Sequence, residues 1–151
     1  MLFANDDHYN FFKEKVKTLK PDCYLKALIY TIGVCDDTRS RWNKIYNEKS
    51  RSIDPDQLNQ PWQTGTSAKV MRLAFQLFTD GTPTAYSGED CETEDFSECQ
   101  KYSVSDIFCC EFAPYFIQAV QIRYPEYFQE RSFSRNNNQY CEESEADELG
   151  Y

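Results

Sequence analysis

The densest group of polar side chains that could carry chemistry is the segment CDDTRSR, residues 35–41. Its adjacent carboxylates, Asp36 and Asp37, could bind a cation together or divide acid and base roles, since neighbouring carboxyl groups separate their pKa values. Arg39 could pair with either of them. The same aspartates would also cap a helix that starts here and complement its dipole. We expect capping, and we keep a small metal-dependent or thiol enzyme as the alternative.

His8 is the only histidine in the chain, which excludes any mechanism that needs two. It stands beside Asp7 in what should be the first turn of a helix, where an imidazole could carry a proton at neutral pH. We expect a surface or partly packed residue instead. With Asp36, Asp37 and Arg39 it makes up the alternative polar site.

Cysteine is frequent, and the number of cysteines is odd. An odd number argues against a closed disulfide framework. Zinc sites use paired ligands such as CxxC or two histidines, and the sequence has neither, so we expect no metal and no cofactor. Only Cys91 and Cys99 could form a ligand pair. The seven cysteines are Cys23, Cys35, Cys91, Cys99, Cys109, Cys110 and Cys141.

Known catalytic spacings are missing from the sequence. The five glycines form no phosphate-binding GxGxxG or GxxxxGK[ST] loop, and no serine stands in a GxSxG elbow. A cysteine nucleophile would need His8 as its base, and nothing local joins the two. We therefore expect a protein that is not an enzyme.

The feature with the most functional promise is an acidic stretch without a basic residue. Its carboxylates could occupy a basic channel on a partner that otherwise holds nucleic acid, and a neighbouring aromatic ring could anchor the contact. The alternative is a solvated loop that only keeps the protein soluble. The partner-binding residues of this hypothesis are Glu89, Asp90, Glu92, Glu94, Asp95, Phe96 and Glu98.

Charge is divided unevenly between the two halves of the chain. The net charge is −9, made up of +2 over residues 1–80 and −11 over residues 81–151. A negative field repels phosphate backbones, so the second half should not bind nucleic acid directly. It suits a partner protein with a basic surface.

Length and composition predict the framework that must position these residues. The 151 residues suit one domain, and apolar side chains recur at helical rather than strand spacing. We expect an all-α domain of five to six helices over residues 1–128, with an acidic loop at 82–102 and an acidic, disordered tail at 129–151. Short strands remain possible in 48–65 and 82–102.

Helix boundaries follow from capping residues, prolines and apolar stripes. The first helix should start at Asn5 to Asp7, bury Tyr9, Phe12, Val16 and Leu19, and stop before Pro21. Gly33 should end the second helix as a left-handed cap. The expected helices span about 6–20, 22–33, 38–47, 66–80, 103–112 and 115–124, with Thr66 or Ser67 capping the fourth and Ser103 the fifth.

Membrane and export signals are missing from the sequence. No apolar run approaches the roughly 20 residues of a spanning helix, and the start MLFANDDHYN has no basic segment typical of a secretory leader. We therefore expect a protein that acts in the cytoplasm of a bacterial host, with no membrane partner.

Four segments carry a family resemblance: DDHYNFF, LKALIYTIGVCDDTR, KVMRLAFQLFTDG and SVSDIFCCEFAPYF. Over about residues 5–125 the chain resembles an uncharacterised family of small proteins, a domain of unknown function, from Firmicutes and their phages and mobile elements. These motifs are mainly helix caps and core faces, so no catalytic residue comes with them.

The resemblance implies a setting in which small accessory proteins bind and adjust host enzymes. The expected function is stoichiometric protein–protein binding that inhibits a host nucleic-acid-handling defence protein, such as a CRISPR effector, in the manner of an acidic anti-CRISPR protein. A self-associating regulatory subunit is a further alternative, besides the small enzyme.

Overall fold

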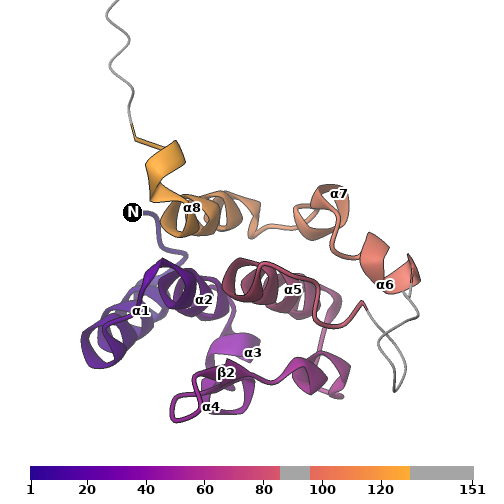
Figure 1. The fold of residues 1–151 in the computed structure, drawn as a ribbon, viewed down its shortest axis with the longest axis horizontal. Coiled ribbons are helices and arrows are strands. Elements are labelled where there is room, and N and C mark those ends of the chain that lie inside the picture. The colour runs from indigo at the N-terminus through magenta and orange to yellow at the C-terminus, as the bar shows by residue number, and fades with distance from the viewer. Residues whose placement is uncertain (86–95, 130–151) are drawn as a thin grey trace, which may run out of the picture.

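The computed structural model describes residues 1–85 and 96–129, and over these ranges the chain is mostly helical, with one two-stranded sheet (Figure 1). This confirms the all-α class. The elements are α1 Asp6–Leu19, α2 Cys23–Gly33, α3 Asp36–Arg39, α4 Trp42–Ile45, β1 Tyr46–Asn47, β2 Ser52–Ile53, the 3-10 helix η1 Pro55–Asn59, α5 Gly65–Thr79, α6 Phe96–Gln100, α7 Val104–Ile107, α8 Ala113–Arg123 and the 3-10 helix η2 Pro125–Tyr127.

Helix α2 lies at the centre of the fold, between α1 and α5 and beneath α8 (Figure 1). Its sequence CYLKALIYTIG is apolar on nearly every side, which is stable only when other helices surround it. Asp22 starts it, as expected, by accepting a hydrogen bond from the backbone N–H of Leu25 at 2.9 Å. Every residue from Ala27 to Gly33 is buried. The core is therefore built around this helix.

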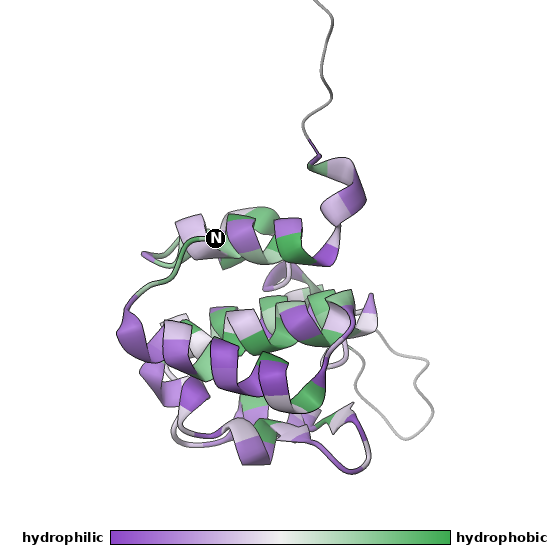
Figure 2. Ribbon diagram, turned by 90° about the vertical axis from the view of Figure 1, so that its left-hand side faces the viewer, coloured by the Kyte–Doolittle hydropathy of each residue, from purple (hydrophilic) through white to green (hydrophobic). Residues whose placement is uncertain are grey.

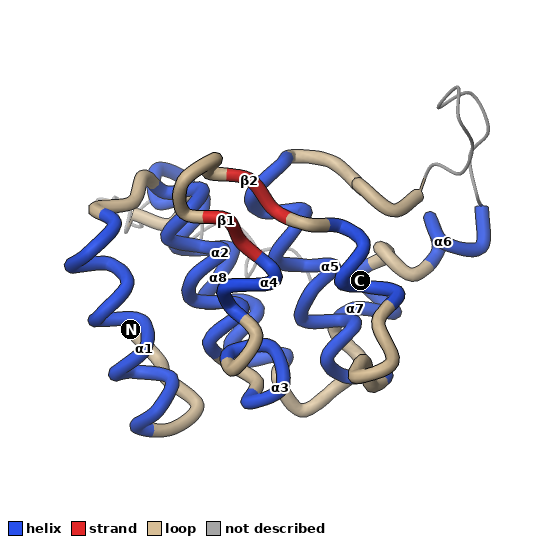
Figure 3. Tube along the Cα trace, turned by 90° about the horizontal axis from the view of Figure 1, so that it is seen from below, coloured by secondary structure: helices blue, strands red, loops and turns tan. Residues whose placement is uncertain are grey.

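The third expected helix is wrong as a single element, because the chain forms two one-turn helices, α3 and α4. Within α3 the Thr38 hydroxyl donates to the carbonyl of Ile32 at 2.7 Å, which holds this short helix against the end of α2. Tyr46 then adopts an extended conformation and β1 begins directly after α4 (Figure 3). The antiparallel pairs are Tyr46–Ile53 and Asn47–Ser52.

The observed N-cap residue is the one expected from the sequence at three helix starts, and it differs at the start of α5. Asn5 and Asp22 cap the expected helices, and Ser103 caps α7, which ends at Ile107 rather than near residue 112 as expected. Helix α5 begins earlier than expected, because Thr64 caps it. The Thr64 side chain accepts from Ser67 N–H at 3.0 Å, and the Ser67 hydroxyl accepts from Thr64 N–H at 2.8 Å, a reciprocal capping box.

The buried face of α1 is rotated from the expected stripe. Phe12 is buried, but Tyr9 is exposed, and His8 takes the core position instead. Gly33 is not a left-handed cap, since it stays within α2 and the following Val34 is also right-handed. Within the part of the chain that the structure describes, none of the helices combines the length and apolar character needed to span a bilayer.

Candidate functional site

His8 is fully buried, so the expected surface position is wrong. Its Nε2 lies 2.8 Å from the carbonyl oxygen of Tyr30 on α2, and its Nδ1 accepts a hydrogen bond from the backbone N–H of Ala4 at 3.2 Å. The proton is therefore on Nε2. Both ring nitrogens hold chain segments together, the first joining α1 to α2 and the second closing the N-terminal segment onto α1.

The pKa of His8 is lowered from 6.5 to about 4. Burial is the largest cause, because it disfavours the charged imidazolium, and the positive charge of Arg39 acts in the same direction. The hydrogen bond to Tyr30 opposes both without cancelling them. His8 is consequently uncharged at neutral pH.

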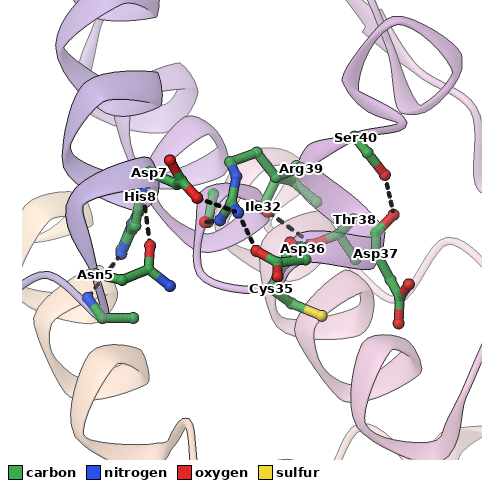
Figure 4. Close-up of polar contacts among 12 residues, drawn as sticks. Asn5, Asp7, His8, Ile32, Cys35, Asp36, Asp37, Thr38, Arg39 and Ser40 are labelled. Atoms are coloured by element: carbon green, nitrogen blue, oxygen red, sulfur yellow. Dashed lines mark hydrogen bonds and ion pairs between the residues drawn. The ribbon is translucent and has the colours of Figure 1, made fainter.

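Arg39 lies between Asp7 and Asp36 (Figure 4). Its NH1 donates to the carbonyl oxygen of Gly33 at 2.7 Å, at the end of α2, and its NH2 forms a hydrogen-bonded ion pair with Asp36 and lies 3.8 Å from Asp7. The expected pairing of Arg39 with one of the two aspartates is confirmed. The arginine thereby joins the start of α1, the end of α2 and α3.

Asp37 takes no part in that cluster. Its carboxylate turns toward Arg41, 3.9 Å from NH1, while its backbone carbonyl accepts from the hydroxyl of Ser40 at 3.3 Å (Figure 4). Asp36 and Asp37 therefore face different arginines. Neither caps α3, because Cys35 occupies the N-cap position; both lie in its first turn, where their charge favours the dipole.

No group of three or more His, Cys, Asp or Glu side chains in residues 1–85 and 96–129 is arranged to hold a metal ion. The free cysteines there are Cys23, Cys35, Cys99, Cys109 and Cys110. Cys91 lies outside the described residues, so the possible pair of Cys91 with Cys99 stays a sequence prediction. The residues of the alternative polar site therefore have two separate structural roles. Arg39 joins three helices, and His8 is a buried, neutral imidazole.

Of the partner-binding set, the structure describes two residues, Phe96 and Glu98, both on α6. Phe96 is the first residue of that helix and its side chain is strongly exposed, at 73%. Glu98 differs, because its side chain is only 14% exposed. The other members, Glu89, Asp90, Glu92, Glu94 and Asp95, lie outside the described residues.

Glu98 fastens α6 to α5. Its Oε1 accepts from Nε of Arg72 at 3.0 Å and from the hydroxyl of Thr84 at 2.9 Å, and its Oε2 accepts from Nζ of Lys101 at 3.0 Å. The Thr84 hydroxyl also lies 2.5 Å from the hydroxyl of Tyr102, whose ring lies under the Arg72 guanidinium. Glu98 is thus engaged within the chain rather than displayed on its surface.

The pKa of Glu98 lies below its ordinary value. Burial is the strongest single influence and would raise it, but the hydrogen bonds from Lys101 and Thr84 and the positive charge of Arg72 together outweigh burial. The carboxylate therefore stays ionised at neutral pH and holds its three donors.

Sequence reasoning missed Arg123, which lies buried at the end of α8. Its Nε donates to the carbonyl of Leu77 at 2.9 Å, and its NH2 donates to both carboxylate oxygens of Asp80 at 2.9 and 3.1 Å. The guanidinium lies over the rings of Tyr24 and Tyr124. A signal was present, since a single arginine ends the otherwise uncharged stretch APYFIQAVQIR.

The comparisons with known proteins are informative about lineage. No curated protein and no solved structure is significantly similar to this chain. A family model does match, over residues 1–136, and it covers the whole helical domain. The chain belongs to that family, the family of unknown function DUF6075.

Proposed function

We propose that this protein acts by stoichiometric binding to a partner protein, through the acidic segment that precedes α6 and the exposed ring of Phe96. The partner has a basic surface that otherwise holds nucleic acid. The residues proposed to contact the partner are Glu89, Asp90, Glu92, Glu94, Asp95 and Phe96. Glu98 is not among them, because its carboxylate is hydrogen-bonded within the chain.

The observation that carries the proposal is the anchoring of α6. The ion pair between Glu98 and Arg72 fixes the helix on α5, and Phe96 stands exposed at its first position. A large aromatic side chain held on a fixed helix loses little conformational entropy on binding, which favours its use as an anchor. It follows directly on five carboxylates within seven residues, 89–95.

Charge supports the choice of partner. The five carboxylates of residues 89–95 would accelerate encounter with a basic surface, and the net charge of −11 over residues 81–151 repels nucleic acid itself. A carboxylate-rich segment in a basic channel would exclude the phosphates that the channel binds. We place this activity in the cytoplasm of a bacterial host, in a protein of phage or mobile-element origin that inhibits a defence protein such as a CRISPR effector.

The test begins with capture of partners from the native host by the tagged full-length chain at low and moderate salt. The captured protein is then purified, and its association rate is measured against the wild-type chain and a Glu92→Gln, Glu94→Gln, Asp95→Asn variant. We expect the variant to associate about tenfold more slowly, and the wild-type rate to fall as salt rises, because steering by charge is screened by ions.

A matched control separates position from net charge. The variant Glu142→Gln, Glu143→Gln, Glu145→Gln removes the same number of negative charges from the tail and should associate nearly as fast as the wild type. Three outcomes would contradict the proposal. Both variants could associate equally slowly, the association rate could be independent of salt concentration, or no partner could be captured at low salt. Phe96→Ala should raise the dissociation rate instead, since an apolar anchor acts after encounter.

A further inference from the structure

Positive charge without an acidic partner is concentrated in one region of the molecule. Within residues 1–85 and 96–129, the basic side chains that form no ion pair all come from residues 13–51, except Lys69, which donates to the carbonyl oxygen of Cys109 at 3.1 Å. Several of them lie at the end of α1, at the start of α2 and in the turn between β1 and β2. We define these as the basic corner: Lys17, Lys20, Lys26, Lys49 and Arg51.

The three segments of the basic corner meet in space. Nζ of Lys15 lies 3.0 Å from Oε1 of Glu48, which fastens the second half of α1 to the β1–β2 turn. Burial raises the pKa of the Tyr46 phenol, the charge and hydrogen bond of Arg51 oppose this, and the charge of Asp22 adds to it. Arg51 and the start of α2 therefore lie near the same ring. Figure 3 shows the turn close to the end of α1 and the start of α2.

Acidic side chains do not balance this positive charge. Residues 13–26 hold five lysines against two acids, Glu14 and Asp22. In the β1–β2 turn, Glu48 is already bound to Lys15. Most side chains of the basic corner are exposed, and Figure 2, seen from the side of α1, shows a mostly hydrophilic outer face on this helix. The corner thus presents positive charge to solvent in a chain whose net charge is −9.

Two members of the basic corner stand where glycine or asparagine is the usual residue. Lys20 and Arg51 adopt left-handed conformations, with φ of 46° and 54°. A long charged side chain is present at both positions although the backbone geometry favours another residue. This favours a role for their charge.

The chain itself contains an acidic segment of opposite charge. Residues 142–148, EESEADE, hold five carboxylates, and no basic residue follows Arg135. These residues lie outside the described part of the chain, which ends at Gln129. They therefore supply the anionic groups that the basic corner lacks among the described residues.

Helix α8, which leads into this tail, ends beside the start of α2. The Arg123 guanidinium lies 3.4 Å from the centre of the Tyr24 ring, and its NH1 lies 3.9 Å from Sγ of Cys23. Lys26 follows Cys23 by three residues and so shares its face of α2. From Gln129 the intervening residues can span up to about 45 Å when extended, so residues 142–148 can reach the basic corner.

We propose that residues 142–148 bind the basic corner of the same chain. The tether gives this acidic segment an effective concentration on the order of millimolar, so it occupies the corner in preference to free anions at lower concentration. It thereby covers lysines that would otherwise attract phosphate polymers. The contact is independent of the proposed function, because it uses different carboxylates.

The other acidic segment is less well placed to bind there. Residues 89–95 are joined at both ends to described chain, and α6, which follows them, is fastened to the middle of α5 through Glu98 and Arg72. In Figure 1, α6 and α1 lie on opposite sides of the molecule. The tail is joined at one end only and leaves from the side of α2.

The test is cross-linking of the full chain with a carbodiimide, which joins a carboxylate to a lysine amine only when the two are in contact. Digestion and mass spectrometry then identify the joined peptides. We expect products that join residues 142–148 to Lys17, Lys20, Lys26 or Lys49 in the monomer at micromolar concentration. They should disappear in about 1 M sodium chloride, where the screening length falls to about 3 Å.

Two variants separate the basic corner from positive charge in general. The reagent does not couple arginine, so Arg51→Gln lowers the charge of the corner without removing a reactive amine. The yield at Lys20 and Lys49 should fall about two- to fivefold. Arg41→Gln removes a charge that already faces Asp37 and should leave the yield unchanged. Circular dichroism checks that both variants are folded.

Several results would overturn the proposal. The tail could give no product with the basic corner, or equal yields with Lys69 and Lys101, which lie outside it. A yield independent of salt would exclude charge as the cause. Products that join two isotopically distinct copies would assign the tail to a second molecule, and products between residues 89–95 and the corner would assign the corner to the other acidic segment.

Discussion

Helices α1 and α2 meet where Gly33 faces His8. A Cβ atom built on Gly33 would lie 2.8 Å from Cδ2 of His8 and 2.9 Å from Cδ1 of Phe11. The His8 ring has no freedom to yield, because both of its nitrogens are hydrogen-bonded. Glycine is therefore needed at position 33 because the two helices approach closely there. His8 is needed beside it because its ring links α1 to the N-terminal segment and to α2.

Replacing Gly33 by alanine should destabilise the fold. Alanine normally favours a helix over glycine by roughly 0.5–1 kcal/mol, but the added methyl group should cost about 1–3 kcal/mol by overpacking. Gly65→Ala is the matched control at the start of α5, because a Cβ there meets nothing within 4 Å. Denaturant unfolding should show Gly33→Ala less stable than the wild type and Gly65→Ala equal or more stable. Equal stability of the two variants would contradict the close contact.

Lowering the pH from 6.5 to 4 should destabilise the protein through His8. The lowered pKa of about 4 means that the unfolded chain takes up a proton first, since an unfolded histidine titrates near 6.5. The free energy of unfolding should therefore fall by up to about 3 kcal/mol more in the wild type than in a His8→Gln variant. The variant is the right reference because its carboxylates titrate over the same pH range. Parallel pH profiles of the two proteins would contradict this. Because His8 is the only histidine, its Cε1 proton gives the only NMR signal of that type, and the titration midpoint of that signal should lie well below 6.5.

Glu98→Gln should loosen α6. Removing the charge leaves Arg72 and Lys101 without their carboxylate, and we expect the free energy of unfolding to fall by about 1–3 kcal/mol. The backbone amides of Tyr102 and Ser103, bonded to carbonyls of α6, should exchange hydrogen faster. Glu111→Gln, at an exposed position, is the control.

Because the pKa of Glu98 is lowered in the folded protein, its contribution to the free energy of unfolding should decrease in acid. Its contribution is present above the unfolded pKa of 4.5 and is lost as the pH falls through the lower folded value. The difference in stability between wild type and Glu98→Gln should therefore shrink in acid. A difference that stays constant from neutral pH to strong acid would rule out the charge as its source.

Arg123→Lys should destabilise the fold by about 3 kcal/mol, because a lysine cannot keep the paired hydrogen bonds to Asp80 or lie flat over two tyrosine rings. Asp80 itself adopts a left-handed conformation, with φ of 57°, which Asn also tolerates. A double-mutant cycle with Asp80→Asn should therefore measure the coupling between the two side chains, and additive effects would show that they do not interact.

Local sequence determined the helices that bury a continuous apolar stripe. In α5 the positions of Val70, Leu73, Ala74 and Leu77 follow helical spacing, and all four are buried. Asn5, Asp22 and Ser103 cap their helices because the capping bond joins residues only three apart. Such features depend on neighbours in the chain, so they can be read from the sequence.

Contacts between distant residues were decided by the tertiary structure alone. His8 is buried rather than Tyr9 because the N-terminal segment folds over it, and Glu98 is an internal anchor because Arg72, 26 residues earlier, faces it. Asp36 and Asp37 look alike in the sequence, yet they face different arginines. Sequence periodicity shows which side of a helix is apolar. Which polar groups become buried depends instead on how helices far apart in the chain pack together. Each buried polar group needs a hydrogen-bonding partner, and only the fold supplies it.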